Sequence, residues 1–324
     1  LKSMTFYGLN RVKEFNVMSE ESELELIESK AFVGLEKIST LDLSYQKLSS
    51  LVNLTFFGLF SLKKLLLGYN RISEIKKNAF NSLQQLEWLD LTSNQLNVIS
   101  SDYFEHLMSL NEILLTSNQF NKDSFSNGSF KGLVSLSHLS INYEKIERLR
   151  RFIFSELTGL TKLELEENEI EFIERNAFYG LQILEILSLR QNSLYDLNLS
   201  SLFGLGSSLK VLNVVSNLIS KIEPGTFANL TGLRELYLSS NMISILNPSL
   251  FVGLKSIETI DLAHNQIKSI DPQTFVGFER IETLDLTQHK LTTIRSFTFI
   301  GLKSVTIIHL EHFNNISEIE PNAF

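Results

Sequence analysis

The sequence predicts an α/β solenoid, a coil of stacked turns with a parallel β-sheet on one side and irregular or 3-10 structure on the other. Three observations predict it: one spacing of leucines returns about every 24 residues, an Asn follows the leucines at a constant distance, and a Phe follows that Asn. The stretch 62–83, LKKLLLGYNRISEIKKNAFNSL, contains all three. An internal period of this length indicates a repeat architecture, in which each copy buries its apolar face against its neighbours.

The repeat covers almost the whole chain. Most copies are 24 residues long, with longer steps after Val12, Leu110 and Leu184. The thirteen copies begin at Val12, Ile38, Leu62, Leu86, Leu110, Leu136, Leu160, Leu184, Leu209, Leu233, Ile257, Ile281 and Val305. We therefore expect a single solenoid over residues 1–324, with about 13 repeats.

Each copy opens with a short predicted strand. In Leu-x-x-Leu-x-Leu the last two leucines are two residues apart, so both point to the same buried face. The third, fifth, seventh and eighth residues of a copy are then expected to point outward. Stacking of the copies places neighbouring strands roughly 4.7–4.9 Å apart in a parallel sheet.

The recurring Asn and Phe are predicted to be structural. A buried Asn amide can bond to carbonyl and N–H groups of adjacent turns and so form a ladder along the coil. The ladder residues are Asn70, Asn94, Asn118, Asn168, Asn192, Asn217, Asn241 and Asn265. The Phe residues that fill the wide side of the coil are Phe80, Phe104, Phe178, Phe227, Phe251, Phe275 and Phe299.

Composition excludes some classes of protein. The net charge of -8 and the pI near 5.4 argue against a generic basic surface for nucleic acid. No apolar run approaches the roughly 18–20 residues of a membrane-spanning helix. The chain has no cysteine, which alone would favour a cytosolic protein.

This pattern resembles the 24-residue leucine-rich repeats of animal extracellular proteins, as in Toll and Toll-like receptors, Slit, chaoptin and the ectodomains of leucine-rich-repeat G-protein-coupled receptors. The resemblance implies a horseshoe with a concave sheet and, usually, Cys-bearing caps. Neither cap is present in the sequence, so we expect an interior portion of a longer ectodomain. The resemblance is specific for the fold and weakly specific for function.

Several copies depart from the frame. The first copy inserts two residues around Glu20–Glu23, and the copy at Leu110 inserts two within 121–129. The last copy has one residue more than the regular repeat, within 310–316. Three residues replace the ladder Asn: Gln46, Glu144 and His289. We interpret the insertions as bulges on the convex side, although the resemblance implies that such copies sometimes form ligand loops.

Five N-x-Ser/Thr sequons favour a secreted or luminal setting: Asn53, Asn127, Asn198, Asn229 and Asn315. Four lie in the returning half of a repeat or its insertion, and Asn315 lies just past the sheet. None is at an outward strand position, so glycans would leave the concave sheet bare.

The concave face is the predicted ligand-binding surface. The second to fifth copies place aromatic and apolar residues on adjacent strands, as in interface hot spots. The predicted ligand-binding residues are Tyr45, Leu66, Tyr69, Trp88, Leu114, Tyr143, Ile186, Val211 and Tyr237. An acidic group follows, formed by Glu164, Glu166 and Glu167 with Glu144 close by, and plain solvated surface is the simpler interpretation of it.

Four histidines fall on consecutive copies near the C-terminal end: His264, His289, His309 and His312. They are candidates for sensing pH between about 5 and 7 or for holding an anionic ligand. Their spacing is not a metal-binding signature, and solvated or turn-filling side chains are the simpler interpretation.

We find no nucleophile motif, phosphate-binding loop or metal spacing, so we expect neither catalysis nor a cofactor. The predicted function is a ligand-binding ectodomain of a cell-surface or endosomal receptor, most similar to a Toll-like receptor. Its expected ligand is a protein or pathogen-derived molecule; nucleic acid is possible but not favoured. Ligand binding is expected to bring two ectodomains together, and this association would produce the signal. Any membrane contact would come from a single-pass segment outside this chain. The alternatives are a Slit- or chaoptin-like adhesion protein, a hormone-binding ectodomain, and an engineered or cytosolic repeat scaffold.

Overall fold

The computed structural model describes residues 1–16, 24–312 and 315–324. The predicted insertion at Glu20–Glu23 lies outside the described residues, as do Phe313 and Asn314 of the long last copy. The chain divides into two compact units. Unit 1 comprises Leu1–Ile146 and Phe152–Glu164, and unit 2 comprises Glu147–Arg151 and Leu165–Phe324.

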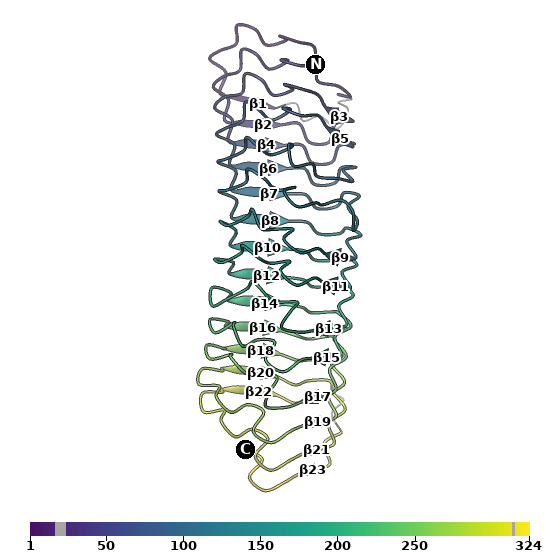
Figure 1. The fold of residues 1–324 in the computed structure, drawn as a ribbon, viewed down its shortest axis with the longest axis vertical. Helices are drawn as coiled ribbons and strands as arrows, with labels where there is room; N and C mark the ends of the chain where they lie inside the picture. Colours follow the sequence, from purple (N-terminus) through teal and green to yellow (C-terminus); the bar gives the residue numbers. More distant parts are fainter. Residues whose placement is uncertain (17–23, 313–314) are drawn as a thin grey trace. The chain divides into compact units, whose positions relative to one another are not determined.

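Unit 1 contains a parallel sheet with one strand from each successive copy (Figure 1). Each strand occupies the third to fifth residues of its copy, where the leucine spacing predicts it. The strands, in spatial and sequence order, are β1 (Glu14–Asn16), β2 (Thr40–Asp42), β4 (Lys64–Leu66), β6 (Trp88–Asp90), β7 (Glu112–Leu114), β8 (His138–Ser140) and β10 (Lys162–Glu164).

Unit 2 repeats the same arrangement with six further copies, and its strands pair in parallel and in register. They are β12 (Ile186–Ser188), β14 (Val211–Asn213), β16 (Glu235–Tyr237), β18 (Thr259–Asp261), β20 (Thr283–Asp285) and β22 (Ile307–His309). The predicted parallel β-solenoid is therefore confirmed within each unit.

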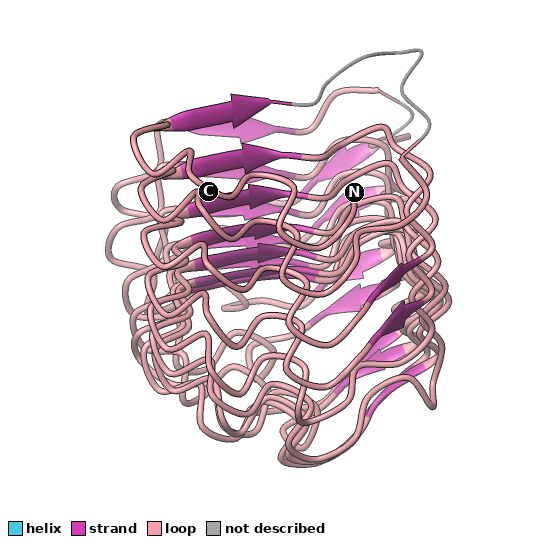
Figure 2. Cartoon of the chain, turned by 90° about the horizontal axis from the view of Figure 1, so that it is seen from above, coloured by secondary structure: helices cyan, strands magenta, loops and turns pink. Residues whose placement is uncertain are grey.

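The returning half of each copy consists of turns and very short strands (Figure 2). Unit 1 has the pair β3 (Ser50–Leu51) and β5 (Glu74–Ile75). Unit 2 has the pairs β9 (Arg148–Leu149) with β11 (Phe172–Ile173), β13 (Asp196–Leu197) with β15 (Lys221–Ile222), β17 (Ile245–Leu246) with β19 (Ser269–Ile270), and β21 (Thr293–Ile294) with β23 (Glu318–Ile319). No helix occurs in the described parts of the chain, so irregular turns rather than 3-10 helices form this side.

The Asn ladder holds adjacent copies together as predicted. Asn94 shows the pattern: its Oδ1 accepts the N–H of Ile72 at 2.9 Å, and its Nδ2 donates to the carbonyls of Leu67 at 3.0 Å and Leu91 at 3.1 Å. One side chain thus satisfies backbone groups of its own turn and of the turn before it, which removes the cost of burying them unpaired.

A column of phenylalanines forms the opposite side of the core. In unit 1 the Phe56 and Phe80 rings stack at 5.7 Å between centroids and the Phe80 and Phe104 rings at 6.3 Å. In unit 2 the Phe275 and Phe299 rings stack at 5.9 Å. All the predicted core phenylalanines are buried, which confirms their structural role.

A left-handed backbone conformation recurs at the eighth residue of each described copy from Ile38 onward. The affected residues are Tyr45, Tyr69, Ser93, Ser117, Tyr143, Glu167, Gln191, Ser216, Ser240, His264, Gln288 and His312. The N–H of this residue bonds to the next copy, as from Tyr45 to the Gly68 carbonyl at 3.0 Å and from Tyr69 to the Thr92 carbonyl at 2.8 Å. These bonds fix the direction in which the eighth side chain leaves the sheet.

The insertion at 121–129 folds back onto the preceding copy in unit 1. Ser124 Oγ donates to the Asn97 carbonyl at 2.6 Å, and Ser129 Oγ donates to the Ile99 carbonyl at 2.7 Å. Phe125 is buried within the insertion and forms a parallel bridge with Ile99. The extra residues are therefore bonded into the wall of the solenoid.

Candidate functional site

The outward face of the unit 1 sheet carries the residues that the sequence places together. Within each strand the middle residue is buried and the residues before and after it are half-buried on the opposite face. Leu66, Trp88 and Leu114 occupy such outward positions. Tyr45 and Tyr69 follow the strands at the eighth position, with exposed fractions of 57% and 50%.

Tyr45 and Tyr69 form a stacked pair. Their ring centroids are 4.4 Å apart and their planes differ by 4°. Tyr143 is equally exposed at the eighth position, three copies further on, and Ser93 and Ser117 occupy the two copies between. The sheet therefore presents one rigid aromatic pair and a separate Tyr rather than a continuous aromatic row.

The Trp88 ring is covered by a cation from the neighbouring strand. Lys64 Nζ lies 3.3 Å from the ring centroid, a cation–π contact between residues that are paired in register. The indole Nε1 is buried and has no hydrogen-bond partner among the described residues. Trp88 is thus less available to a ligand than its place in the sequence suggests.

The apolar residues of this face are interrupted by carboxylates. Leu66 pairs with Asp42 on one side and Asp90 on the other, and Asp90 separates Leu66 from Leu114. Asp42 Oδ1 accepts the N–H of Ser44 at 2.9 Å, and Asp90 Oδ1 accepts that of Thr92 at 2.8 Å. These carboxylates therefore help to end the strands as well as charging the surface.

A charged row lies on the same face, and Glu164 is its one member that was singled out from the sequence. His138 Nδ1 is 3.2 Å from Glu112 and its Nε2 is 3.1 Å from Glu164, whose other oxygen is 2.6 Å from Lys162 Nζ. The hydrogen bond with His138, together with Lys162, lowers the pKa of Glu164 to about 2 despite partial burial. The third and fifth positions of successive copies would have revealed this row had their charges been compared copy by copy.

Glu144 is part of the ladder and not of the acidic surface expected near it. Its side chain is only 5% exposed and stands where other copies have Asn. Its carboxylate accepts the N–H groups of Asn118 and Phe120. Burial raises the pKa of Glu144 to about 7, against the opposing effect of these two hydrogen bonds.

The predicted residues of unit 2 are distributed along its own sheet. Ile186 and Val211 are neighbours in register and half-buried. The Tyr237 hydroxyl donates to Glu235 at 2.7 Å, and this bond, with some burial, raises its pKa to about 12. Glu166 accepts a hydrogen bond from Ser188 Oγ at 2.7 Å.

The four histidines of unit 2 have different environments. His289 is 3% exposed at a ladder position, neither ring nitrogen has a described partner, and burial lowers its pKa to about 4. The titration between pH 5 and 7 expected from the sequence therefore does not apply to His289. His309 Nδ1 lies 2.9 Å from Glu311, while His264 and His312 are exposed. In the described ranges, no three His, Cys, Asp or Glu side chains are grouped to hold a metal ion.

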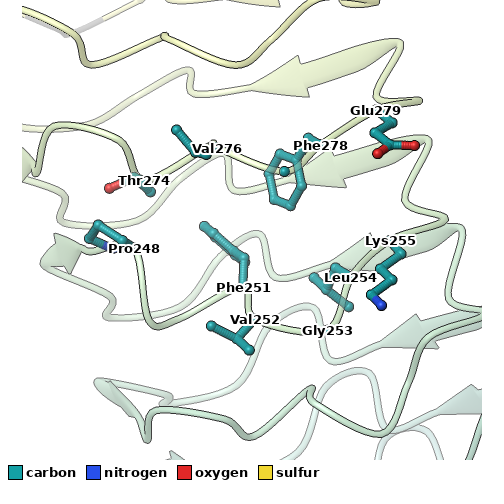
Figure 3. Close-up of a pocket in the computed structure, with 11 residues that line it drawn as sticks. Pro248, Phe251, Val252, Gly253, Leu254, Lys255, Thr274, Val276, Phe278 and Glu279 are labelled. Carbon is teal, nitrogen blue, oxygen red and sulfur yellow. The ribbon is translucent and has the colours of Figure 1, made fainter.

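A hollow of about 460 Å³ lies on the returning side of unit 2 (Figure 3). Phe251, Val252, Val276 and Phe278 contribute its apolar wall, with Lys255 and Glu279 at one side. Val252 and Val276 are exposed. This hollow lies between two neighbouring copies, and it contains none of the residues predicted to bind ligand.

Four sequon asparagines, Asn53, Asn127, Asn229 and Asn315, are exposed. Asn198 is half-buried, and its Oδ1 accepts the N–H of Ser201 at 3.0 Å. In the described sheet strands no sequon asparagine occurs, so the outward strand positions of each unit are free of them.

Comparison with protein families identifies the repeat. The model of the family "Leucine rich repeat" matches residues 20–72, 60–120, 158–208, 207–267, 241–291 and 258–316. The chain belongs to the leucine-rich-repeat family. No curated protein matched the sequence.

Three solved leucine-rich-repeat structures illustrate the shared fold. The Toll–Spatzle complex of Drosophila matches with 22% identity, a TM-score of 0.79 and coverage of 91% of this chain and 40% of that chain. The TLR13–ssRNA13 complex matches with 23% identity, a TM-score of 0.59 and coverage of 85% and 47%. A chain of the octameric complex of Latrophilin 3, Unc5D and FLRT2 matches with 22% identity, a TM-score of 0.68 and coverage of 79% and 77%.

At sequence identities of 22–23%, these structural similarities establish a shared fold and nothing about function. The chain spans less than half the length of the Toll and TLR13 chains that it matches. Across the described residues, no helix is long and apolar enough to cross a membrane.

Proposed function

We propose that this chain is a non-catalytic ligand-recognition ectodomain of a cell-surface or endosomal receptor of the Toll-like kind. The stacked pair Tyr45–Tyr69 carries the proposal. Two half-exposed rings, held parallel at 4.4 Å by a hydrogen-bonded backbone, form a rigid anchor that needs little ordering when a ligand binds.

The setting of the pair supports a binding role. Leu66 and Trp88 lie beside it on the same face, and exposed sequon asparagines lie away from the sheet strands. Glycans at Asn53 and Asn127 would leave the unit 1 strand face accessible. The likeness to structures of Toll with Spatzle and of TLR13 with single-stranded RNA supports a ligand-binding role for this fold. In this proposal, ligand binding brings two ectodomains together.

An adhesion role is the second candidate. It is supported by the match to a chain of the complex of Latrophilin 3, Unc5D and FLRT2, because the match covers 77% of that matched chain. The same strand face would then contact another cell-surface protein, without a signalling segment in the protein.

The experiment is a binding screen on the glycosylated chain. Purified secreted proteins, cell-surface ectodomains and single-stranded RNA are titrated by biolayer interferometry, and each binder is retested on Tyr69→Ser. Ser is the residue that the neighbouring copy carries at the same position, as Ser93. The control is Tyr179→Ser, which removes an exposed Tyr on the returning side of unit 2.

We expect Tyr69→Ser to weaken binding by about tenfold or more and Tyr179→Ser to leave it unchanged. Light scattering should show the chain associating when a receptor ligand is added. Binders that are insensitive to Tyr69→Ser would contradict the proposed site, and binding without association would favour the adhesion role.

A further inference from the structure

The Tyr45–Tyr69 pair has an open ring face. Tyr45 covers one face of the Tyr69 ring, and no other ring or cation contacts Tyr69 among the described residues. The next copy carries only Ser93 at the equivalent position. A flat or cationic group of a ligand can therefore stack on Tyr69.

Two carboxylates beside the pair lack a cation. One oxygen of Asp42 and one of Asp90 each accept a backbone N–H just past the end of the strand. Neither carboxylate forms an ion pair with a described residue. Burial raises the pKa of the Tyr45 hydroxyl, and the negative charges of Asp90 and Asp42 add to that rise. Elsewhere on this face, by contrast, Glu112 and Glu164 are paired with His138.

The backbone keeps one of these carboxylates accessible. Gly68 has no side chain, and a Cβ added there would lie 3.3 Å from Asp90 Oδ2 and 3.4 Å from the Thr92 carbonyl oxygen. Leu66 lies in register between Asp42 and Asp90 and gives an apolar floor between the two charges. The arrangement is an aromatic face, an apolar floor and two negative charges within three adjacent copies.

We propose that Tyr45, Tyr69, Asp42, Leu66 and Asp90 form a docking site for an arginine-bearing segment of a protein partner. A guanidinium is planar, stacks on aromatic faces and bonds a carboxylate through two parallel N–H groups. Its methylene stem can pack on Leu66 while the charged end reaches Asp90. The net charge of -8 favours the approach of a basic segment over that of an acidic one.

This inference rests on the proposed function, since it gives the chemistry of the partner for the same strand face. The probe is a synthetic peptide of alternating Arg and Gly, compared with peptides in which Lys or Glu replaces Arg. The emission of Trp88, the single Trp of the chain, reports binding beside the site, and calorimetry gives the dissociation constant. Titrations are made at physiological ionic strength, where long-range attraction is screened.

Asp90→Asn is the main variant, because Asn keeps an oxygen that can accept the Thr92 N–H. Asp285→Asn is its matched control: Asp285 bonds the N–H of Thr287 at 2.9 Å in the same way, but Gln288 stands at the eighth position of its copy. Both variants change the net charge by the same amount. Tyr69→Ser tests the stacking contact.

We expect the Arg peptide to bind more tightly than the Lys peptide and the Glu peptide not to bind. Asp90→Asn and Tyr69→Ser should each weaken binding of the Arg peptide about tenfold, and Asp285→Asn less than twofold. Equal effects of Asp90→Asn and Asp285→Asn, or absence of binding by the Arg peptide, would overturn the inference. A protein ligand whose binding depends on Tyr69 but not on Asp90 would overturn it and leave the proposed function standing.

Discussion

The carboxylate of Glu144 accepts the backbone N–H of Phe120 at 2.9 Å, in a place where other copies use an Asn amide. An amide is neutral at every pH of interest, whereas a carboxylate must either ionise in a buried site or hold its proton. Burial favours the protonated form, which is why the pKa of Glu144 rises to about 7. The ladder of unit 1 therefore contains one step that responds to pH.

Replacing Glu144 with Gln should make stability less dependent on pH. An unfolded Glu loses its proton near pH 4.5 and the folded Glu144 near pH 7, so the free energy of unfolding of the parent protein falls as pH rises between these values. Below this range Glu144 is neutral in both states, and above it the loss is complete. Between pH 4.5 and 7.5 we expect the free energy of unfolding of the parent protein, measured by urea unfolding, to fall by roughly 2–3 kcal/mol more than that of Glu144→Gln. The exposed Glu169→Gln is the control, and parallel curves for the parent and Glu144→Gln would contradict the prediction.

His289→Asn should stabilise unit 2. The buried ring nitrogens of His289 have no described partner, whereas Asn at this position can form the bonds that Asn265 forms in the preceding copy. Satisfying buried polar groups is worth roughly 1–3 kcal/mol. Thermal unfolding above pH 6, where His289 is neutral in the folded chain, should show a higher midpoint. The exposed His264→Asn provides the comparison, and an equal shift in both variants would argue against the ladder explanation.

Asn94→Ala should destabilise unit 1 strongly. It removes the acceptor of the Ile72 N–H and the donor to the Leu67 and Leu91 carbonyls, and leaves these buried groups unpaired. We expect a loss of roughly 2–5 kcal/mol in the free energy of unfolding. Gln95→Ala changes the adjacent exposed residue and should have little effect. A similar denaturation midpoint for the two variants would show that the ladder bonds contribute little.

The ionisation of Glu164 should depend on His138. The contact with His138 and the ion pair with Lys162 hold the pKa of Glu164 near 2, so its stabilising contribution is complete above about pH 4.5 and is lost as the pH falls towards 2. Carbon NMR of the Glu164 carboxyl should show a midpoint near pH 2 in the parent and a higher midpoint in His138→Ala. His106→Ala removes a histidine elsewhere in unit 1 and should leave the midpoint unchanged. A Glu164 midpoint that stays near 2 without His138 would contradict this assignment.

Much of the fold can be read from the spacing of apolar residues. The positions of the strands, the buried leucines, the Asn ladder and the Phe column all follow from local periodicity, because each copy meets the same neighbours and repeats the same contacts. The departures can be located in the same way: Gln46, Glu144 and His289 stand out because they break an otherwise regular position. The frame also indicates which residues point outward, and hence that Tyr45, Tyr69 and Trp88 lie on one face.

What each of these residues contacts was decided only by the tertiary structure. Two tyrosines at equivalent positions are expected to be neighbours, but their parallel stacking depends on the left-handed turns that aim both rings, and the covering of Trp88 depends on the rotamer of Lys64. Likewise the sequence does not show that the Glu144 carboxyl is buried in the ladder. Nor does it show that Asp42 and Asp90 form no ion pair with a described residue. Periodicity determines the backbone, which repeats, whereas the binding surface depends on side-chain packing between copies, which differs at every step.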